Sequence, residues 1–458
     1  AAHLALRHAA AVEGAAHRGH GMSLRTRELG FLVPALLLGM LGLAAGTSAR
    51  ADELQAGPWQ TALGVAMVFV VMHAVLRMRA PLSDPYLVPI MAALTGIGLA
   101  MLYRIDPGLA GDQAIWVTLG GIVFCAVIVF MPDHRVLERY RYIIGLTAVM
   151  LLVFTMAFGT EVNGSRLWIE IGGGQRVQLG ELAKVLMVIF LAGYLREKRE
   201  VLAIPTQRRL GMNLPAPRHL APILVFWGAA LAAVVVLNDF GTALLFFGVF
   251  LAMLYLATGR ALYVGLGITL FAAGSLFIWA AVPRIGARVD SWLHPFTDPQ
   301  GGGYQMVQSL YALADGGVVG PGFGRALLVT EGGTPRIPAL ETDFIFSAVS
   351  NDLGYVGAIG VMLLYVLLMA RGFAIATAAR DGFSKLLAGG LTAVVGLQAF
   401  IIIGGVVRLV PLTGVTLPFM SYGGSSVVVN FGIAALLLVI SNRSRQGLVE
   451  AVRGVPAT

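Results

Sequence analysis

Residues 240–258 read FGTALLFFGVFLAMLYLAT, nineteen positions without one charged side chain. An α-helix rises ~1.5 Å per residue, so this run would span ~28 Å, close to the ~30 Å hydrocarbon core of a bilayer. The sequence therefore predicts a membrane-spanning helix at this position.

Similar apolar runs recur along the 458-residue chain, of which only 12% is charged. That is about half the charged fraction of a soluble protein. We predict an all-α polytopic membrane protein with about twelve spans, near residues 30–48, 59–76, 85–103, 114–131, 142–159, 178–195, 219–237, 240–258, 261–283, 345–370, 386–407 and 425–441.

The net charge of +8 is explained by membrane topology. If the N-terminus is cytoplasmic, the loops and tails on that side carry 22 Lys and Arg, against 9 on the other side. This asymmetry predicts that both termini are cytoplasmic and suits contact with anionic membrane lipids. It gives no reason to expect a nucleic-acid partner. The single cysteine, Cys125, excludes an intramolecular disulfide.

The predicted organisation has four parts: a cytoplasmic tail (1–29), two N-terminal spans (30–84), a transmembrane core (85–441) and a cytoplasmic tail (442–458). The first tail has four arginines and no long apolar run, unlike a secretory signal peptide. Two outer segments interrupt the core, the polar 160–177 and the long loop 284–344. That loop contains the amphipathic run YQMVQSLYAL, which predicts a short interfacial helix.

Ionisable side chains within lipid are costly and are therefore functional candidates. Glu181 and Lys184 lie one helical turn apart, either as an intrahelical ion pair or as the wall of a cavity for a charged head group. Asp239 lies in a tight turn, where capping of the next helix is the simpler interpretation. Asp352 follows Asp343 by ~14 Å along one helix and needs a partner or a wet cavity.

The segment PALETDFIFS (338–347) places Glu341 and Asp343 just before an apolar helix. Either Thr342 or Asp343 caps that helix by accepting its first amide hydrogens, or Asp343 is a catalytic base. Further on, LVPLTGVTLPFMSYGGSSVV (409–428) breaks a span with prolines and glycines. Irregular backbone at this depth must be buried in protein or line a cavity, although packing of small residues is an alternative.

Arg166 and Trp168, in NGSRLWIEIG, are expected near the outer surface, where tryptophan is a common membrane anchor. This motif is followed in order by QLGELAK, LNDFGTALLFF, DPQGGGYQMVQSLYALADGGVVGPGFG, ETDFIFSAVSNDLG and PLTGVTLPFMSYGGSS. Together they resemble the SEDS family, the RodA, FtsW and SpoVE proteins of cell shape, elongation, division and sporulation. The resemblance covers roughly residues 85–441, a ten-helix core.

The resemblance implies a peptidoglycan glycosyltransferase of the cytoplasmic membrane. Its substrate would be lipid II, an undecaprenyl-diphosphate-linked disaccharide peptide, polymerised at the outer face. It also implies a class B penicillin-binding protein as partner, which cross-links the product.

The family's motifs also imply roles for individual residues. Asp343 matches the essential acid of the large outer loop. The residues implied to bind substrate are Arg166, Trp168, Glu181, Lys184, Asp239, Arg288, Gln305, Ser309, Ser421, Gly423 and Gly424.

The chain departs from the family's pattern at several positions. Leu179 and Gly180 replace Pro-Ser, Glu341 replaces a common His, and Asn351 and Asp352 replace Glu-Glu. The P-T-K-G of many members reads PLTG at 411–414, without its lysine. We hypothesise that Arg408 supplies the missing positive charge. The spans 30–48 and 59–76 exceed the usual ten and resemble an actinobacterial-type extension.

The implied reaction joins a sugar hydroxyl to the anomeric carbon of another sugar and expels a lipid diphosphate. An α-linked donor and a β-1,4 product require inversion, for which one carboxylate base contributes about 10²–10⁴-fold. The leaving diphosphate needs positive charge, for which Arg166, Lys184, Arg288 and Arg408 are candidates. No cofactor is evident, although Mg²⁺ or Mn²⁺ bridging the phosphates is compatible with this chemistry.

Two other functions stay open from the sequence: a transporter that flips a lipid-linked precursor, and a scaffold for cell-wall enzymes. Transporters bind near the bilayer midplane between repeated halves, whereas the polar residues here gather on the outer side and show no clear repeat.

Overall fold

The computed structural model describes residues 22–50, 56–162, 165–172, 175–203, 207–209, 212–214, 228, 232, 235, 239–281, 283–329 and 334–452. Its elements are α2 (Leu24–Arg50), α3 (Ala56–Arg79), α4 (Leu87–Ile105), α5 (Pro107–Phe130), α6 (Val136–Arg139), α7 (Arg141–Phe158), β1 (Thr160–Val162), β2 (Ser165–Gly172), β3 (Gln175–Val177), α8 (Leu179–Ala203), β4 (Gln207–Arg209), β5 (Met212–Leu214), α10 (Phe240–Thr258), α11 (Ala261–Ala281), α12 (Pro283–Leu293), η1 (Pro295–Thr297), α13 (Tyr304–Gly316), α14 (Ile345–Ala378), α15 (Gly382–Val406) and α16 (Gly424–Val452).

Nine helices within these ranges are long and apolar enough to cross a membrane: α2, α3, α4, α5, α7, α10, α14, α15 and α16. Helix α11 has a shorter apolar stretch, Ala261–Leu276, and α8 carries Glu181 and Lys184 near its start. These eleven helices coincide with eleven predicted spans. The twelfth, 219–237, lies almost entirely outside the described residues, so the count of twelve stays a prediction.

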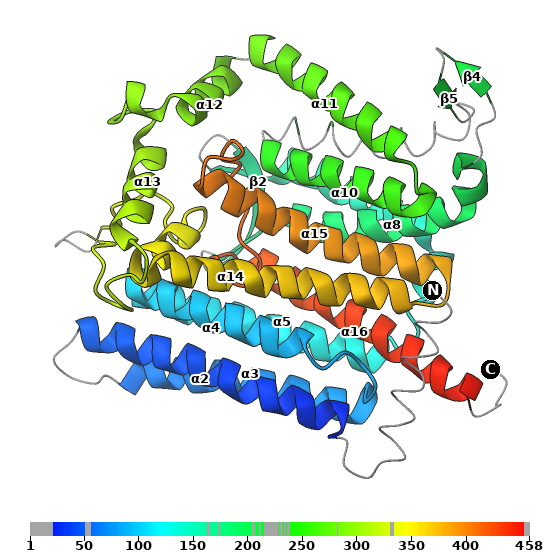
Figure 1. Ribbon diagram of the computed structural model, residues 1–458, viewed down its shortest axis with the longest axis horizontal. Helices are drawn as coiled ribbons and strands as arrows, with labels where there is room; N and C mark the ends of the chain where they lie inside the picture. Colours follow the sequence, from blue (N-terminus) through cyan, green and yellow to red (C-terminus); the bar gives the residue numbers. More distant parts are fainter. Residues whose placement is uncertain are drawn as a thin grey trace.

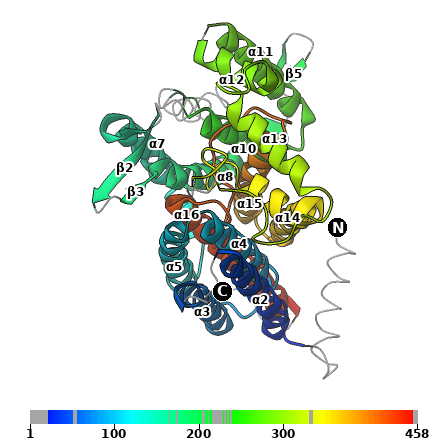
Figure 2. The same ribbon diagram turned by 90° about the vertical axis from the view of Figure 1, so that its left-hand side faces the viewer.

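The spanning helices form one bundle with its irregular segments at one end. Helices α4, α8, α10, α14, α15 and α16 run side by side, α12 and α13 lie at one end, and α16 terminates at the other (Figure 1). Viewed along the bundle, α2 and α3 lie on one side and α11 on the opposite side (Figure 2). The loop 284–344 therefore covers one end of the bundle.

Three local features differ from the prediction or extend it. The polar segment 160–177 forms a small antiparallel sheet in the order β1-β2-β3, which the all-α prediction missed and which pairs backbone groups outside the helices. Helix α13 confirms the short amphipathic helix. Helix α2 begins inside the predicted N-terminal tail, and α16 continues to Val452, through most of the predicted C-terminal tail.

The N-terminal helix pair packs tightly against the core through small residues. A Cβ at Gly39 of α2 would lie 2.8 Å from the Gly96 Cα of α4, so the two backbones meet without intervening side chains. A Cβ at Gly121 of α5 would come within 2.3 Å of Val68 on α3. Without a hydrophobic driving force in lipid, such close backbone approach is a main source of helix association.

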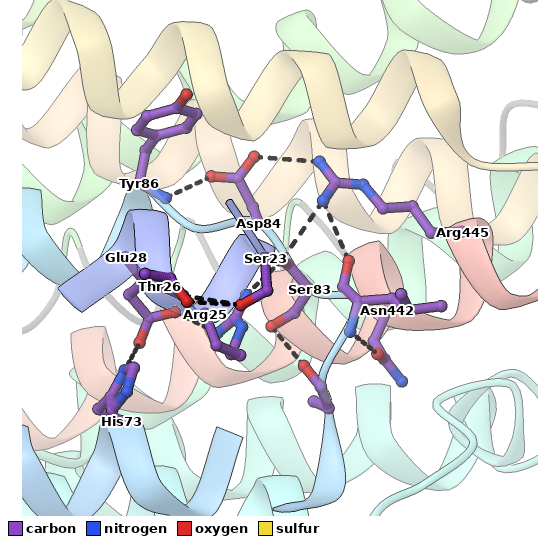
Figure 3. A network of polar contacts seen from close by, with 12 residues as sticks. Ser23, Arg25, Thr26, Glu28, His73, Ser83, Asp84, Tyr86, Asn442 and Arg445 are labelled. Carbon is purple, nitrogen blue, oxygen red and sulfur yellow. Dashed lines mark hydrogen bonds and ion pairs between the residues drawn. The ribbon is translucent and has the colours of Figure 1, made fainter. Parts of the chain in front are cut away.

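A buried polar cluster joins α2 to α3 at the end of the bundle opposite α13 (Figure 3). The carboxylate of Glu28, fully buried, accepts hydrogen bonds from Arg25 and from His73 Nδ1, the latter at 2.8 Å. Arg25 also donates to the carbonyl of Ser83, in the loop after α3. The helix pair is thus tied to the start of the core.

The same loop is tied to the last helix through Asp84, whose carboxylate is fully buried. It accepts from Arg371 Nε of α14 at 3.1 Å and pairs with Arg445 Nη2 of α16 at 3.6 Å. The amide of Leu82 donates to Asn442 Oδ1 at 3.0 Å (Figure 3). One carboxylate therefore joins three elements that lie far apart in sequence.

We expect Asp84→Ala to lower the free energy of unfolding by about 2–3 kcal/mol. This lies below the ~3–5 kcal/mol of a fully buried pair, because the partner guanidinium groups are 31% and 29% exposed. The melting midpoint of the detergent-purified protein measures the effect. The matched control is Glu170→Ala, which breaks an exposed pair with Arg176 and should cost at most ~1 kcal/mol. Equal midpoints for both variants would contradict the role given to Asp84.

Candidate active site

Asp343 lies in a turned segment, 338–344, that precedes α14. The amides of Thr342, Asp343 and Phe344 all donate to the carbonyl of Ala339, at 3.3, 3.0 and 3.3 Å. The N-cap position of α14 is Phe344, without a side-chain capping bond. The predicted cap by Thr342 or Asp343 is therefore wrong, because the Phe344 amide donates to the Ala339 carbonyl and α14 begins at Ile345, one residue later than a cap by Asp343 requires. The Asp343 carboxylate is left available for other contacts.

The irregular segment 407–423, between α15 and α16, packs directly against this turn. Ser421 Oγ donates to the Thr342 carbonyl at 2.6 Å, and the Tyr422 amide donates to the Glu341 carbonyl at 2.9 Å. A Cβ at Gly414, where φ is 72°, would lie 3.7 Å from Asp343 Oδ2. The PLTG and SYGG motifs thus meet the acid-containing turn.

Helix α5 fixes the other side of the SYGG motif. Gln113 Nε2 donates to the Ser421 carbonyl at 3.0 Å, and Gln113 Oε1 accepts from the Gly423 amide at 3.4 Å. A Cβ at Gly424 would lie 2.1 Å from Trp116, so only glycine fits against this ring. The role of Gln113 was not predicted from the sequence, because its partner lies 308 residues away in the chain.

A buried polar group supports the irregular segment from within the bundle. Lys184 Nζ donates to Glu181 Oε2 at 2.6 Å, which confirms the predicted ion pair, and to Gln398 Oε1 at 2.8 Å. Gln398 Nε2 in turn donates to the Thr416 carbonyl at 2.8 Å. Gln398, fully buried on α15, was also missed by the sequence analysis.

The segment also carries two threonine hydroxyls without hydrogen-bond partners among the described residues. Within the described part of the chain, Thr413 Oγ1 and Thr416 Oγ1 are buried without a hydrogen-bond partner. They flank Gly414, which lies beside Asp343. A buried polar atom without a partner is costly, so these hydroxyls are candidates for contact with a ligand.

Asp239 confirms the predicted cap, because its Oδ1 accepts from the Thr242 amide of α10 at 2.9 Å. A Cβ at Gly241 would lie 2.6 Å from the Thr413 carbonyl, so the start of α10 lies against the irregular segment. Arg288 of α12 is close enough to act electrostatically on both Asp239 and Asp343. These residues therefore belong to one neighbourhood.

The half-buried position of Asp343 changes its acidity. Burial raises the pKa of Asp343 to about 6. A hydrogen bond from Thr342 and the charge of Arg288 lower this pKa, whereas the neighbouring carboxylate of Glu341 raises it. A carboxylate with a pKa near the working pH is well matched to accept a proton.

Three predicted site residues lie away from Asp343 or support its surroundings. Arg166, on β2 and exposed, pairs with Glu161 at 3.3 Å. Trp168 is half-buried on the same strand. Gln305 Nε2 of α13 donates to the Pro338 carbonyl at 3.4 Å, at the base of the turn. None of these contacts involves Asp343, and the part of these residues in substrate binding stays a prediction.

Two more predicted residues make contacts that hold elements together. Ser309 Oγ of α13 hydrogen-bonds Ser347 Oγ of α14 at 2.8 Å. Arg408, at a φ of 63°, donates to the carbonyls of Trp292 and Leu293 at 3.2 and 3.0 Å. Arg408 therefore joins the irregular segment to the end of α12.

Asp352, which was expected to need a partner or a wet cavity, has a partner in Arg104 of α4, whose Nε lies 2.8 Å from Asp352 Oδ2. The same carboxylate accepts the amides of Gly324 and Ala326 at 3.2 and 3.1 Å. Helix α14 breaks at Gly354, where φ is 62°. The long outer loop is thus fastened to α14 two turns below Asp343.

The described residues contain no group of three or more His, Cys, Asp or Glu placed to hold a metal ion. The cation considered from the sequence stays a prediction.

Comparison with known proteins places this arrangement among bacterial cell-wall proteins. A model of the FtsW/RodA/SpoVE family, described as cell cycle proteins, matches residues 86–446. The peptidoglycan glycosyltransferase RodA of Mycobacterium tuberculosis is 40% identical over 442 residues, 93% of this chain and 92% of that protein. The stage V sporulation protein E of Bacillus subtilis is 32% identical over 79% of this chain and 98% of its own length.

Solved structures give the same result. A chain from a peptidoglycan synthase complex that coordinates polymerization and crosslinking superposes with a TM-score of 0.65 at 26% identity, over 80% of this chain and 99% of its own length. The rod shape determining protein RodA of Thermus thermophilus superposes with a TM-score of 0.56 at 25% identity, over 78% and 96% of the two chains.

The site depends on close contact between α4 and the irregular segment, which Gly98→Ala should disturb. A Cβ at Gly98 would lie 2.5 Å from the Met420 carbonyl oxygen and 2.7 Å from its Cα, and a backbone cannot rotate away. We expect a loss of about 1–3 kcal/mol in the free energy of unfolding, measured as a lower melting midpoint. Gly111→Ala in α5 is the control, because no atom lies within 4 Å of its Cβ. An unchanged midpoint for Gly98→Ala would show that this packing is looser than described.

Proposed function

This chain belongs to the FtsW/RodA/SpoVE family of cell cycle proteins and is a multi-pass membrane peptidoglycan glycosyltransferase, and we propose that it polymerises lipid II with Asp343 as general base. The observation that carries the proposal is the half-buried Asp343 carboxylate, with a pKa of about 6, held between the outer turn and the irregular segment.

The proposed reaction is a single displacement with inversion. The 4-hydroxyl oxygen of one sugar forms a bond to the anomeric carbon of the other, and the bond from that carbon to the lipid diphosphate breaks. The hydroxyl proton passes to Asp343, and the diphosphate leaves with the bonding electron pair. The diphosphate is a good leaving group, so it needs charge stabilisation and no proton donor.

The described cations differ in where they lie relative to the proposed reaction centre. Lys184 is buried against Glu181, so its charge is already largely neutralised. Arg288 lies near both Asp239 and Asp343, close to the proposed reaction centre. Arg408 lies on the irregular segment beside α12. We therefore assign charge stabilisation mainly to Arg288 and Arg408, with any divalent cation bound by the phosphates themselves.

The cellular role follows the relatives' names. Identity to RodA of Mycobacterium tuberculosis, 40%, exceeds the 32% to the FtsW of Geobacter metallireducens, which favours a role in cell elongation. The superposition with a chain of a peptidoglycan synthase complex supports a class B penicillin-binding protein as partner. Both termini would be cytoplasmic, as the distribution of Lys and Arg predicts.

Two other functions are separated by one experiment. Purified protein is mixed with its penicillin-binding partner and labelled lipid II in detergent micelles, where flipping across a bilayer has no meaning. A glycan polymer identifies an enzyme, whereas intact lipid II would favour a transporter or a scaffold.

We expect Asp343→Asn to reduce polymerisation by about 10²–10⁴-fold in that assay, the usual contribution of a general base. Membrane insertion and co-purification with the partner should be unchanged, since Asp343 makes no capping bond. Glu341→Gln is the matched control, two residues away, and should retain polymerisation. Glycan synthesis by Asp343→Asn at the wild-type rate would exclude this base.

The pH dependence of kcat/KM is an independent test of Asp343 as the general base. A base must be deprotonated, so kcat/KM should fall below a pH of about 6 and level off above it. Removing the Glu341 charge should lower the pKa of Asp343 and move this midpoint to lower pH in Glu341→Gln. A midpoint that does not move would show that the group whose protonation controls kcat/KM is not Asp343.

Arg408 has two candidate roles, which two substitutions separate. If its charge stabilises the diphosphate, Arg408→Ala should lose at least about tenfold in kcat, and Arg408→Lys should retain most activity. If its hydrogen bonds to the Trp292 and Leu293 carbonyls matter most, Arg408→Lys should also lose activity. A lysine ammonium cannot replace the planar guanidinium group that donates to both carbonyls. Unchanged polymerisation in Arg408→Ala would reject both roles.

A further inference from the structure

A second polar cavity lies on the outer end of the bundle, apart from the Asp343 site. Its volume is about 290 Å³, and it is lined by α13, by loop residues within 321–328 and 336–337, and by Asn351 of α14. Among the described residues, Ala339, Thr342 and Gly414 beside Asp343 do not line this cavity. The proposed displacement reaction therefore leaves it without a role.

The cavity has a positive rim. Arg325 and Arg336 are exposed at its edge, and within the described ranges neither forms an ion pair with a carboxylate. Asp315 is the one carboxylate among the described lining residues. Two guanidinium groups against one carboxylate favour an anionic ligand, and an arginine fork matches a carboxylate with two parallel hydrogen bonds.

The floor combines apolar and amide groups. Leu328 and Ile337 are each 3% exposed, and Asn351 is 6% exposed. Asn351 Nδ2 donates to the Ala312 carbonyl at 2.8 Å. Its Oδ1 accepts no hydrogen bond from the described residues and is available to a ligand. Asn351 stands where the family usually has Glu, and an amide there does not repel an anion. The apolar floor suits side chains, the amide oxygen of Asn351 suits a peptide N–H, and the two arginines suit a carboxylate. Together they fit a short peptide that ends in a carboxylate.

The cavity is held in shape before any ligand arrives. Arg104 donates to the Ala326 carbonyl, and the Ala326 amide donates to Asp352 Oδ1 at 3.1 Å. The Arg336 amide donates to the Leu328 carbonyl at 2.9 Å, joining the two lining strands of loop. A preformed site loses less free energy on binding because little has to be ordered.

The cavity also lies within reach of the reaction centre. Arg336 precedes Ala339 by three residues, which extend at most ~11 Å, and the Asp343 amide bonds directly to the Ala339 carbonyl at 3.0 Å. A peptide of three to five residues extends ~10–17 Å. A sugar held at Asp343 could therefore place its peptide in this cavity.

We propose that this cavity binds the carboxylate-bearing peptide of the lipid-linked disaccharide or of the growing glycan strand. The proposal rests on the proposed function, since it takes its ligand from that substrate. Arg325 and Arg336 bind the carboxylate, Asn351 accepts a peptide amide, and Leu328 and Ile337 contact the side chains. The cavity thus selects substrates that carry a peptide, while Asp343 acts on the sugar.

The test compares two substrates of the same complex: lipid II, and a lipid-linked disaccharide without its peptide. The double variant Arg325→Gln/Arg336→Gln should raise KM for lipid II by at least about tenfold, the effect of losing a charge-assisted hydrogen bond. KM for the peptide-free substrate should change less than about twofold. Arg176→Gln, which removes a positive charge from the outer β3 strand, is the control for general charge effects and should change neither value.

Each other outcome overturns the proposal. Equal KM values of the wild-type protein for the two substrates would show that no peptide site exists. A KM change shared by both substrates would assign the arginines to the sugar or the diphosphate. A change that vanishes when the penicillin-binding partner is omitted would make the cavity a docking site for that protein. Polymerisation of the peptide-free substrate by the wild-type protein upholds the glycosyltransferase function in every case, so the two proposals fail independently.

Discussion

Backbone groups at membrane depth need hydrogen-bond partners from the protein itself, and the segment 407–423 is where this structure depends most on that requirement. Its partners come from three elements. Gln113 of α5 binds the SYGG motif, Gln398 of α15 binds the Thr416 carbonyl, and the turn before α14 accepts from Ser421 and Tyr422. Removing any one of these elements would leave polar backbone in a low-dielectric interior, where each unsatisfied group is costly.

The same contacts connect the fold to the chemistry. Because the irregular segment is held against the turn 338–344, Asp343 is half-buried and its pKa rises to about 6, which suits a base. The Lys184–Glu181 pair contributes less through its own charge than through Gln398, which it holds in place for Thr416. The buried pair is thus part of the support for the reaction centre, and its cost in lipid is offset by that positioning.

Sequence reasoning succeeded where the signal is local. Apolar runs located the spanning helices, i to i+3 spacing gave the Glu181–Lys184 pair, and a turn before an apolar run gave the cap by Asp239. It failed where the partner is distant. The cap expected from Asp343 does not form, because Asp343 lies in a turn closed by the Ala339 carbonyl and the N-cap position falls on Phe344. Gln113, Gln398 and Arg104 acquire their roles only through tertiary contacts, and no local spacing marks them.

The polar cluster around Asp84 has a consequence for biosynthesis. Asp84 is inserted early, yet Arg371 follows it by 287 residues, and Arg445 reaches the neighbouring Ser83 carbonyl across 362 residues. At ~5–20 residues per second of translation, the carboxylate waits roughly 18–72 s for its second guanidinium group. Until then water must solvate this carboxylate. The loop after α3 therefore gains its last ion-pair partner only when the chain is nearly complete.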